Sequence, residues 1–389
     1  MIIRNLTTKG FLIFILFMGA TGIQAQEEPY DFHAGIKQDI AKNMQGGIHS
    51  GYAQLGLINL SATLSSDQAG LWENGIWKLH LQNTYGHQPT KKLVGDVQVF
   101  SNIEHGNYTY LYQFWYKHQM ENFSILAGKH DMNSIFFTSE QAGLYINSSF
   151  GIMPVASLNV PVSIFPSTTL GAVAAYHAAK GLTIRGGVYN GYPGEITQTN
   201  FGTDLNLNFS RGLFYIGELA WSHQIGNLKS TYKIGGFYHG GNFTHPGDPG
   251  HVHQGAGGLY LIADQMLTPQ QSKENTQAGL FFQTGYSPDP CSMNDFYMAA
   301  GVNVFIPTEA ERFNKLGLAI AHASINDQLR QHSSTDYQSC ETAVELTYTH
   351  HITDQIKIQP DMQYIIHPGM RSYRDNCLVG LVRLQWAYD

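Results

Sequence analysis

Hydrophobic and polar residues alternate with a period of two along much of this chain. In the final segment the polar parity contains Arg383 and Gln385, whereas the other parity holds Leu378, Gly380, Val382, Leu384, Trp386 and Tyr388. Segments 344–349 and 356–367 repeat the pattern. Because successive side chains of a strand point to opposite faces, the pattern predicts β-strands with one apolar and one wet face.

The predicted strands have the length and aromatic content of membrane-spanning strands. They run about 9 to 12 residues, enough for a tilted crossing of a bilayer. Apolar rows often end in an aromatic residue, as at Trp77, Trp221 and Trp386, where a barrel meets lipid headgroups. A further apolar row is expected at Tyr108, Tyr110, Tyr112, Phe114 and Tyr116. Soluble sandwiches also alternate, but these features favour a transmembrane antiparallel β-barrel.

Sixteen strands account for the alternating segments, and an even number lets a barrel begin and end on the same side of the membrane. We expect them near 47–64, 76–86, 97–105, 108–118, 122–130, 167–177, 182–190, 212–223, 229–241, 257–267, 276–286, 295–306, 316–325, 340–350, 356–366 and 377–388. A further candidate at 203–209 would break the parity, so we assign it to a loop.

The connections between these strands differ in length on the two sides of the barrel. Those near 119–121, 178–181, 224–228 and 351–355 are short and share one side, whereas the long polar ones near 65–75, 242–256, 326–339 and 367–376 share the other. This asymmetry is typical of outer-membrane barrels. The tight connection at 106–107 and the longer ones at 87–96, 268–275 and 307–315 are exceptions.

The third outer connection, residues 131–166, is the longest, with 36 residues. Loops of this length in a compact fold are usually functional. Its stretch from Pro154 to Pro166 is apolar and poorly suited to lie free in water. Since a sixteen-stranded barrel has a wide aqueous interior, we expect this loop to fold into the lumen and narrow the channel.

The first residues resemble a secretory leader. Arg4 and Lys9 are followed by the apolar run Phe11 to Ala20, and Ile23-Gln24-Ala25 ends on a small residue. We expect cleavage after Ala25, so that 1–25 is a signal peptide, 26–46 a periplasmic N-terminal segment and 47–389 the barrel. The apolar run is short of the roughly 20 residues that a membrane-spanning helix needs.

Charge and cysteine content narrow the function further. The formal net charge is −7, from 22 basic and 29 acidic residues, and there is no long basic run, which excludes a nucleic-acid-binding function.

The three cysteines, Cys291, Cys340 and Cys377, are widely spaced. We expect no disulfide between Cys340 and Cys377, because one strand lies between the strands that carry them. The two positions are then roughly 10 Å apart, which exceeds the distance that a disulfide can span.

Several short motifs give the chain a family resemblance. They are GKHDMN at 128–133, INSSFG at 146–151, PSTTLGAVAAY at 166–176, VYNG at 188–191, ADQML at 263–267 and IQPDMQYIIHPG at 358–369. In this order they resemble the OprB-type carbohydrate-selective porins of bacterial outer membranes. The resemblance implies a sixteen-stranded barrel with an inward third loop that passes monosaccharides and similar small sugars. It also accommodates Pro360, which lacks a ladder donor.

The residues that would meet a sugar follow from the lumenal parity of the strands. A sugar that sheds water in a narrow pore needs hydrogen-bond donors and acceptors from the wall. Strand parity gives the wall candidates Gln98, Asn102, Glu104, Gln113, Lys117, Arg185, Glu218, Asp264, Glu345, Asp361, Gln363 and Arg383. Trp115 shares this face and could stack on a pyranose ring or pack beneath the inward loop. Asp131 and Asn147 come from that loop, and Lys129 joins the lumen only through a bulge or a rim position.

Other functions fit the sequence less well. A general diffusion porin without sugar preference is the main alternative, since the same barrel serves both. An enzyme would need a facing nucleophile and base, which scattered Ser and His residues do not suggest. His245, His251 and His253 lie in a Gly/Pro-rich loop where solvated histidines are commoner than a metal site. We therefore expect no cofactor and no metal, with sugars as permeants, outer-membrane lipid as surroundings and homo-oligomerisation left open.

Overall fold

The computed structural model describes residues 29–388 except 195–200, 204, 206, 208, 246–247, 270–273, 309–311 and 334–335. The expected signal peptide, 1–25, lies outside the described residues, as does part of the loop assigned to 203–209. No helix in the described part of the chain is both long and apolar enough to cross a membrane.

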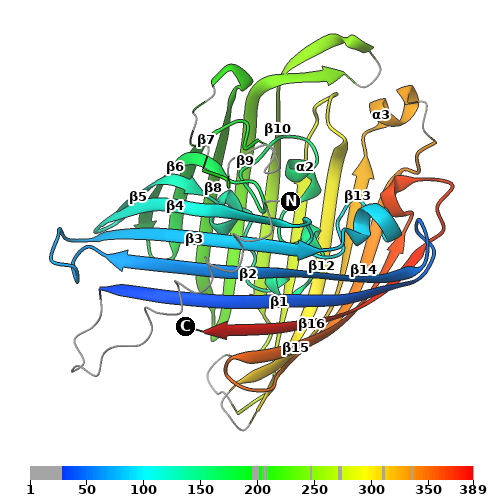
Figure 1. Ribbon diagram of the computed structural model, residues 1–389. Helices are drawn as coiled ribbons and strands as arrows, with labels where there is room; N and C mark the ends of the chain where they lie inside the picture. The colour runs from blue at the N-terminus through cyan, green and yellow to red at the C-terminus, as the bar shows by residue number, and fades with distance from the viewer. Residues whose placement is uncertain are drawn as a thin grey trace, which may run out of the picture.

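The described residues form sixteen antiparallel strands that close into one barrel (Figure 1). They are β1 (Tyr30–Gln45), β2 (Gly51–Ser65), β3 (Gly75–Gly86), β4 (Tyr108–Met120), β5 (Phe123–His130), β6 (Thr169–Ala179), β7 (Leu182–Asn190), β8 (Leu213–Ile225), β9 (Leu228–His245), β10 (Asp248–Met266), β11 (Gln277–Tyr286), β12 (Asn294–Pro307), β13 (Phe313–Ile325), β14 (Cys340–His351), β15 (Ile356–Ile366) and β16 (Cys377–Tyr388). The helical pieces include α2 (Pro154–Ser157), α3 (Asp327–His332), the π-helical turn Thr90–Val94 and short 3₁₀ turns.

The barrel closes through a strand that the sequence pattern placed outside it. Tyr30–Gln45, within the expected periplasmic segment 26–46, is β1, and it pairs with β2 on one side and β16 on the other. Its alternation is weak because Gln38 lies on the outer face, where Tyr85 Oη donates to it at 2.8 Å. Conversely, the expected strand 97–105 belongs to the connection between β3 and β4. The count of sixteen is confirmed, but these two memberships were wrong.

This exchange also changes which connections share an end of the barrel. We call the end with 66–74, 121–122, 180–181, 226–227 and 352–355 the turn end, and the end with 87–107, 131–168 and 367–376 the loop end. The connection 65–75, expected among the long outer loops, therefore lies at the turn end. The exceptions at 87–96 and 106–107 disappear, because they are parts of one long loop-end connection.

The two faces of the strands follow the predicted parity in most of the barrel. Leu384 is 42% exposed on the outer face, whereas its neighbour Arg383 is 3% exposed on the inner face. The exception is β4, whose pairing with β3 shifts register between His80 and Leu81. This bulge turns Tyr110 and Tyr112 inward, so the expected continuous aromatic row was wrong there.

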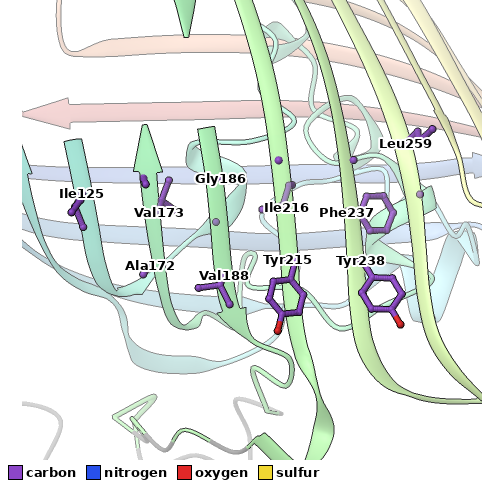
Figure 2. Close-up of a pocket in the computed structure, with 15 residues that line it drawn as sticks. Ile125, Ala172, Val173, Gly186, Val188, Tyr215, Ile216, Phe237, Tyr238 and Leu259 are labelled. Atoms are coloured by element: carbon purple, nitrogen blue, oxygen red, sulfur yellow. The ribbon is translucent and has the colours of Figure 1, made fainter. Parts of the chain in front are cut away.

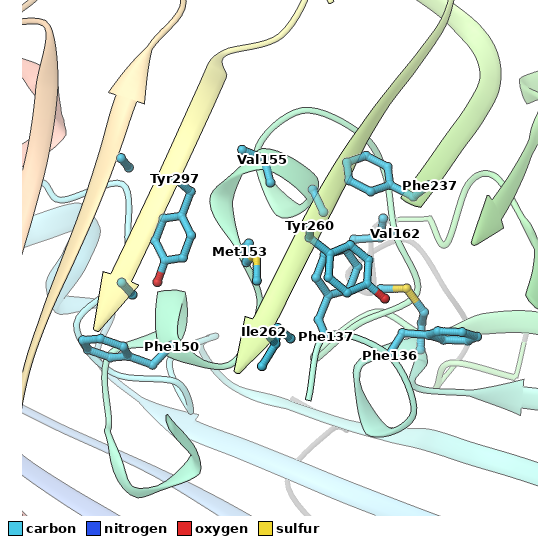
Figure 3. Close-up of a cluster of buried hydrophobic side chains, with 14 of the residues drawn as sticks. Phe136, Phe137, Phe150, Met153, Val155, Val162, Phe237, Tyr260, Ile262 and Tyr297 are labelled. Carbon is cyan, nitrogen blue, oxygen red and sulfur yellow. The ribbon is translucent and has the colours of Figure 1, made fainter. Parts of the chain in front are cut away.

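The largest hydrophobic core cluster of the described residues lies inside the barrel, between the inward-folded connection 131–168 and the wall strands β6 to β13 (Figure 3). Phe137 of the connection stacks on Tyr260 of β10, with ring centroids 4.0 Å apart. The wall leaves room for this packing: a Cβ at Gly285 of β11 would lie 2.5 Å from Val155 of α2. The expected inward folding of the third loop is thus present in the structure.

The three cysteines are free thiols. Cys377 is buried and its Sγ lies 3.1 Å from Asn43 Oδ1. Cys340 is on β14 and Cys377 on β16, with β15 between them, as expected for thiols that do not form a disulfide.

Candidate functional site

Carboxylates on the inner wall hold the inward connection 131–168 in place. Glu345 on β14 accepts the backbone N–H groups of Ile146 and Asn147, at 2.6 and 3.0 Å. Asp264 on β10 accepts the hydroxyl of Ser139 at 2.5 Å and the N–H of Glu140 at 3.0 Å. Each of these four bonds satisfies a backbone N–H or hydroxyl donor of the connection. They fix the loop across the lumen on two sides.

Neutral side chains add to this attachment. Asn147 Nδ2 donates to Gln363 Oε1 on β15 at 3.1 Å, and Gln363 Nε2 donates to Asp361 Oδ1 at 3.0 Å. On β12, Tyr297 Oη donates to the carbonyl of Ser149 at 2.8 Å. The predicted wall residue Gln363 therefore binds the loop directly, and Asp361 binds Gln363.

The beginning of the connection is tied to the bulged strand β4. Asp131 Oδ2 accepts the hydroxyl of Tyr112 at 2.5 Å, and its Oδ1 accepts the backbone N–H of Asn133 at 2.8 Å. Burial raises the pKa of the Asp131 carboxyl to about 6. Lys129 is buried beside it and donates to the carbonyl of Thr168, at the other end of the same connection. Both residues act here as fasteners of the loop.

A second segment, 87–107, also folds into the lumen. Glu341 on β14 accepts the N–H groups of Val97 at 3.0 Å and Gln98 at 3.0 Å. Gln363 donates to the carbonyl of Phe100 at 2.8 Å, and the N–H of Asn102 donates to Ile146 of the first inward connection at 3.0 Å. The two inward segments therefore contact each other as well as the wall.

The sequence pattern missed this second segment because 97–105 alternates like a strand. One signal could have revealed it. The exceptions to the loop asymmetry, 87–96 and 106–107, flank that segment. If 97–105 is not counted as a strand, 87–96 and 106–107 join with it into one long connection at the loop end.

The turn-end half of the lumen contains a cavity of about 500 Å³. Four predicted site residues line it, namely Gln113, Trp115, Lys117 and Arg185, together with Lys78, His130 and Lys233. Trp115 Nε1 donates to Gln113 Oε1 at 3.0 Å, so its ring carbons are the part left to meet a solute. Arg185 pairs with the buried Glu218 at 3.0 Å, and Tyr260 Oη donates to Glu218 at 2.9 Å.

Another cavity, of about 250 Å³, lies between the two inward segments. Gln98, Ser101, Asn102 and Glu104 from the second segment line it opposite Phe165 from the first. Burial raises the pKa of the Glu104 carboxyl to about 8, although the N–H of Thr90 donates to it at 3.1 Å. Gln98, Asn102 and Glu104 were predicted as wall residues, and the structure places them on this inward segment instead.

The structure divides the predicted site residues into two groups. Gln113, Trp115, Lys117 and Arg185 border the turn-end cavity. The others are engaged with loops, with each other or with buried partners: Lys129, Asp131, Asn147, Glu218, Glu345, Asp361, Gln363 and Arg383. Most of the predicted acceptors therefore already hold protein donors.

A hollow of about 730 Å³ lies on the outer face and not in the lumen (Figure 2). The surface is recessed there because Gly186, Gly217 and Gly236 have no side chains. The exposed rings of Tyr215 and Tyr238 border the hollow. An apolar surface of this kind suits acyl chains and offers nothing to a sugar.

The comparisons with known proteins agree with this architecture. The chain matches the family profile of the carbohydrate-selective porins, OprB family, over residues 49–388. It is 23% identical to the putative porin QuiX of Acinetobacter baylyi, over 92% of this chain and 89% of that protein. It is also 23% identical to Porin B of Pseudomonas aeruginosa, over 66% of this chain and 61% of that protein.

Among solved structures, the high-pH structure of Pseudomonas putida OprB superimposes with a TM-score of 0.84, at 19% identity, over 92% of this chain and 94% of that chain. This likeness shows the fold. The family match covers most of the chain, and the fold is the one that the resemblance implied. The chain therefore belongs to the OprB family of carbohydrate-selective porins and is an integral barrel of the bacterial outer membrane.

Proposed function

We propose that small sugars diffuse through the lumen past the two inward segments, and that the polar cavities between and beside these segments provide the wall contacts. One observation carries this proposal. The connections 87–107 and 131–168 are fastened across the interior, and the cavities left beside them are lined by hydrogen-bonding side chains. A wide general pore would not need both segments inside.

The lining suits a permeant that both donates and accepts hydrogen bonds. In the turn-end cavity Lys117 and Arg185 supply donors, while Gln113 supplies an amide and Trp115 an apolar ring. In the cavity between the segments, Ser101 and Asn102 supply groups that both donate and accept. Such contacts replace a sugar's water shell one bond at a time, which keeps binding weak enough for release.

Uptake into proteoliposomes tests this function. Glucose and a zwitterionic amino acid of matched size are presented to the same pores, and we expect glucose to enter faster. Trp115→Leu should lower that preference, whereas Trp221→Leu, which changes an indole exposed on the outer face, should leave it unchanged. If glucose enters no faster than the zwitterion in the unmodified protein, the pore is a general diffusion porin.

A further inference from the structure

Basic side chains gather in the turn-end half of the lumen. Lys78 of β3, Lys117 of β4, Arg185 of β7 and Lys233 of β9 line the 500 Å³ cavity. Lys315 of β13 and Lys357 of β15 line a neighbouring cavity of about 230 Å³. All six lie within five residues of the turn end of their strands. This arrangement runs against the overall formal charge of −7.

The carboxylates nearby do not neutralise this cluster. No carboxylate is among the described residues that line the larger cavity. Glu218 lies behind Arg185, is buried and pairs with that guanidinium at 3.0 Å, whereas it acts on Lys233 only from beyond ion-pair distance. Asp264 is occupied by Ser139 and the backbone of Glu140. Glu73 and Glu121 lie in the turns, whereas Glu140 lines the smaller cavity and pairs with Lys229 at 2.6 Å.

The basic side chains are also positioned to face a solute. Within the described part of the chain, Lys78 and Lys117 have no carboxylate within ion-pair distance. Lys78 lies directly across the strand pair from Trp115, so a cation and an aromatic ring lie side by side on the wall. Lys233 donates to the carbonyl and hydroxyl of Thr138, both at 2.6 Å, and keeps its charge uncompensated by a carboxylate at contact distance.

An excess of positive charge on a narrow, low-dielectric wall raises the local concentration of anions. Hydrogen-bonding groups and an aromatic ring on the same wall favour a polyhydroxylated molecule. We propose that this cavity selects sugar acids, that is, polyhydroxylated monocarboxylates, over neutral sugars of the same size. The inference rests on the proposed function and adds the charge of the preferred permeant.

Paired uptake measurements test this inference. The purified protein is placed in proteoliposomes with potassium and valinomycin on both sides, so that entry of an anion builds up no potential. Radiolabelled gluconate and glucose are compared in the unmodified protein, in the double variant Lys78→Gln/Lys117→Gln and in Lys180→Gln. Lys180 is an exposed cation in the turn between β6 and β7 and serves as the matched control.

We expect gluconate to enter faster than glucose in the unmodified protein and in Lys180→Gln. In the double variant the gluconate-to-glucose ratio should fall by roughly two- to thirtyfold, since two exposed charge contacts with the carboxylate are lost. Glucose entry should fall much less than gluconate entry, because glutamine keeps an amide donor at both positions and only the charge is lost.

A parallel bilayer measurement gives a second readout. Under a potassium chloride gradient, the zero-current potential should indicate anion selectivity and should shift toward cation selectivity in the double variant. A gluconate rate at or below that of glucose, or a ratio that the double variant leaves unchanged, overturns the inference while the sugar-porin function stands. Glucose entry no faster than that of the size-matched zwitterion removes the proposed function itself.

Discussion

Arg383 of β16 and Asp39 of β1 form a two-pronged ion pair across the seam where the barrel closes. Arg383 Nε lies 2.7 Å from Asp39 Oδ1, and its terminal nitrogen lies 2.8 Å from Oδ2. The same guanidinium donates to Asn102 at 2.9 Å, and Ser101 donates to Asp39 at 2.7 Å. The first strand, the last strand and the second inward segment thus meet at one buried ion pair.

Arg383→Ala should therefore destabilise the barrel. Removing the guanidinium leaves the buried Asp39 carboxylate without its partner, which typically costs about 3 to 5 kcal/mol. The free energy of unfolding can be measured by urea titration in lipid vesicles. Lys357→Ala is the matched control, because this lumenal cation on β15 has no ion pair among the described residues. Equal stability of the two variants would contradict the structural role of Arg383.

The parity of β16 predicts that substitution by arginine destabilises the barrel at one position and has little effect at the next. Leu384→Arg places a charge on the outer face and should lower the free energy of unfolding in lipid by roughly 2 to 4 kcal/mol if the position is near the bilayer midplane. Gln385→Arg places the same charge on the lumenal face and should have little effect. Vesicle refolding yields and urea titrations distinguish the two, and a reversed order would mean that the register is wrong.

The attachment of the inward connection can be tested at Glu345. In Glu345→Gln, one of the two backbone N–H groups of residues 146 and 147 faces an amide donor, so about 1.5 to 3 kcal/mol of attachment is lost. We expect the single-channel conductance of Glu345→Gln to be larger and to fluctuate more than that of the unmodified protein, because the connection is held less firmly. Deleting most of 140–160 should raise conductance further and abolish the preference for glucose. Glu121→Gln, in an exposed turn, is the control, and a deletion that leaves conductance unchanged would contradict a constricting role.

The second inward segment should depend on pH through Glu104. Its pKa is raised from the usual 4.5 to about 8, chiefly by burial. Between these values the folded carboxyl keeps a proton that the opened segment releases, so stability is fully present below about pH 4.5 and is lost as pH rises through 8. Hydrogen exchange of amides in 87–107, corrected for intrinsic rates, should show more opening at pH 8 than at pH 5. Glu104→Gln should flatten this dependence, and a wild-type segment equally protected at both values would refute it.

The sequence was sufficient to predict the fold class because two-sided strands leave a strong pattern, clearest in β14 to β16. It was insufficient for β1, where Gln38 and Lys42 stand on the outer face. Their polarity is offset locally: Gln38 donates to the carbonyl of Leu55 at 3.0 Å, and Lys42 lies over the ring of Tyr52 at 4.8 Å. Such partners are far apart in sequence, so alternation alone cannot identify them.

The candidate site was harder to predict than the fold for a related reason. Parity correctly placed Gln113, Lys117, Glu345 and Gln363 on the inner face, but it says nothing of what lies inside the barrel. A polar lumenal side chain meets water or a folded-in backbone, and Glu345 meets the latter. The distinction depends on the paths that 131–168 and 87–107 take inside the barrel, and strand parity does not give those paths.

Because 87–107 and 131–168 are attached to the inner wall, the circumference of the barrel and the width of its passage are determined by different parts of the chain. The circumference depends on the number of strands and their lipid-facing rows, whereas the bore depends on two connections that touch no lipid. Substitutions confined to those connections can resize or recharge the passage while the outer surface and its insertion into the membrane stay the same. Members of such a family can therefore differ in the solutes they admit while the strands that determine the barrel fold stay the same.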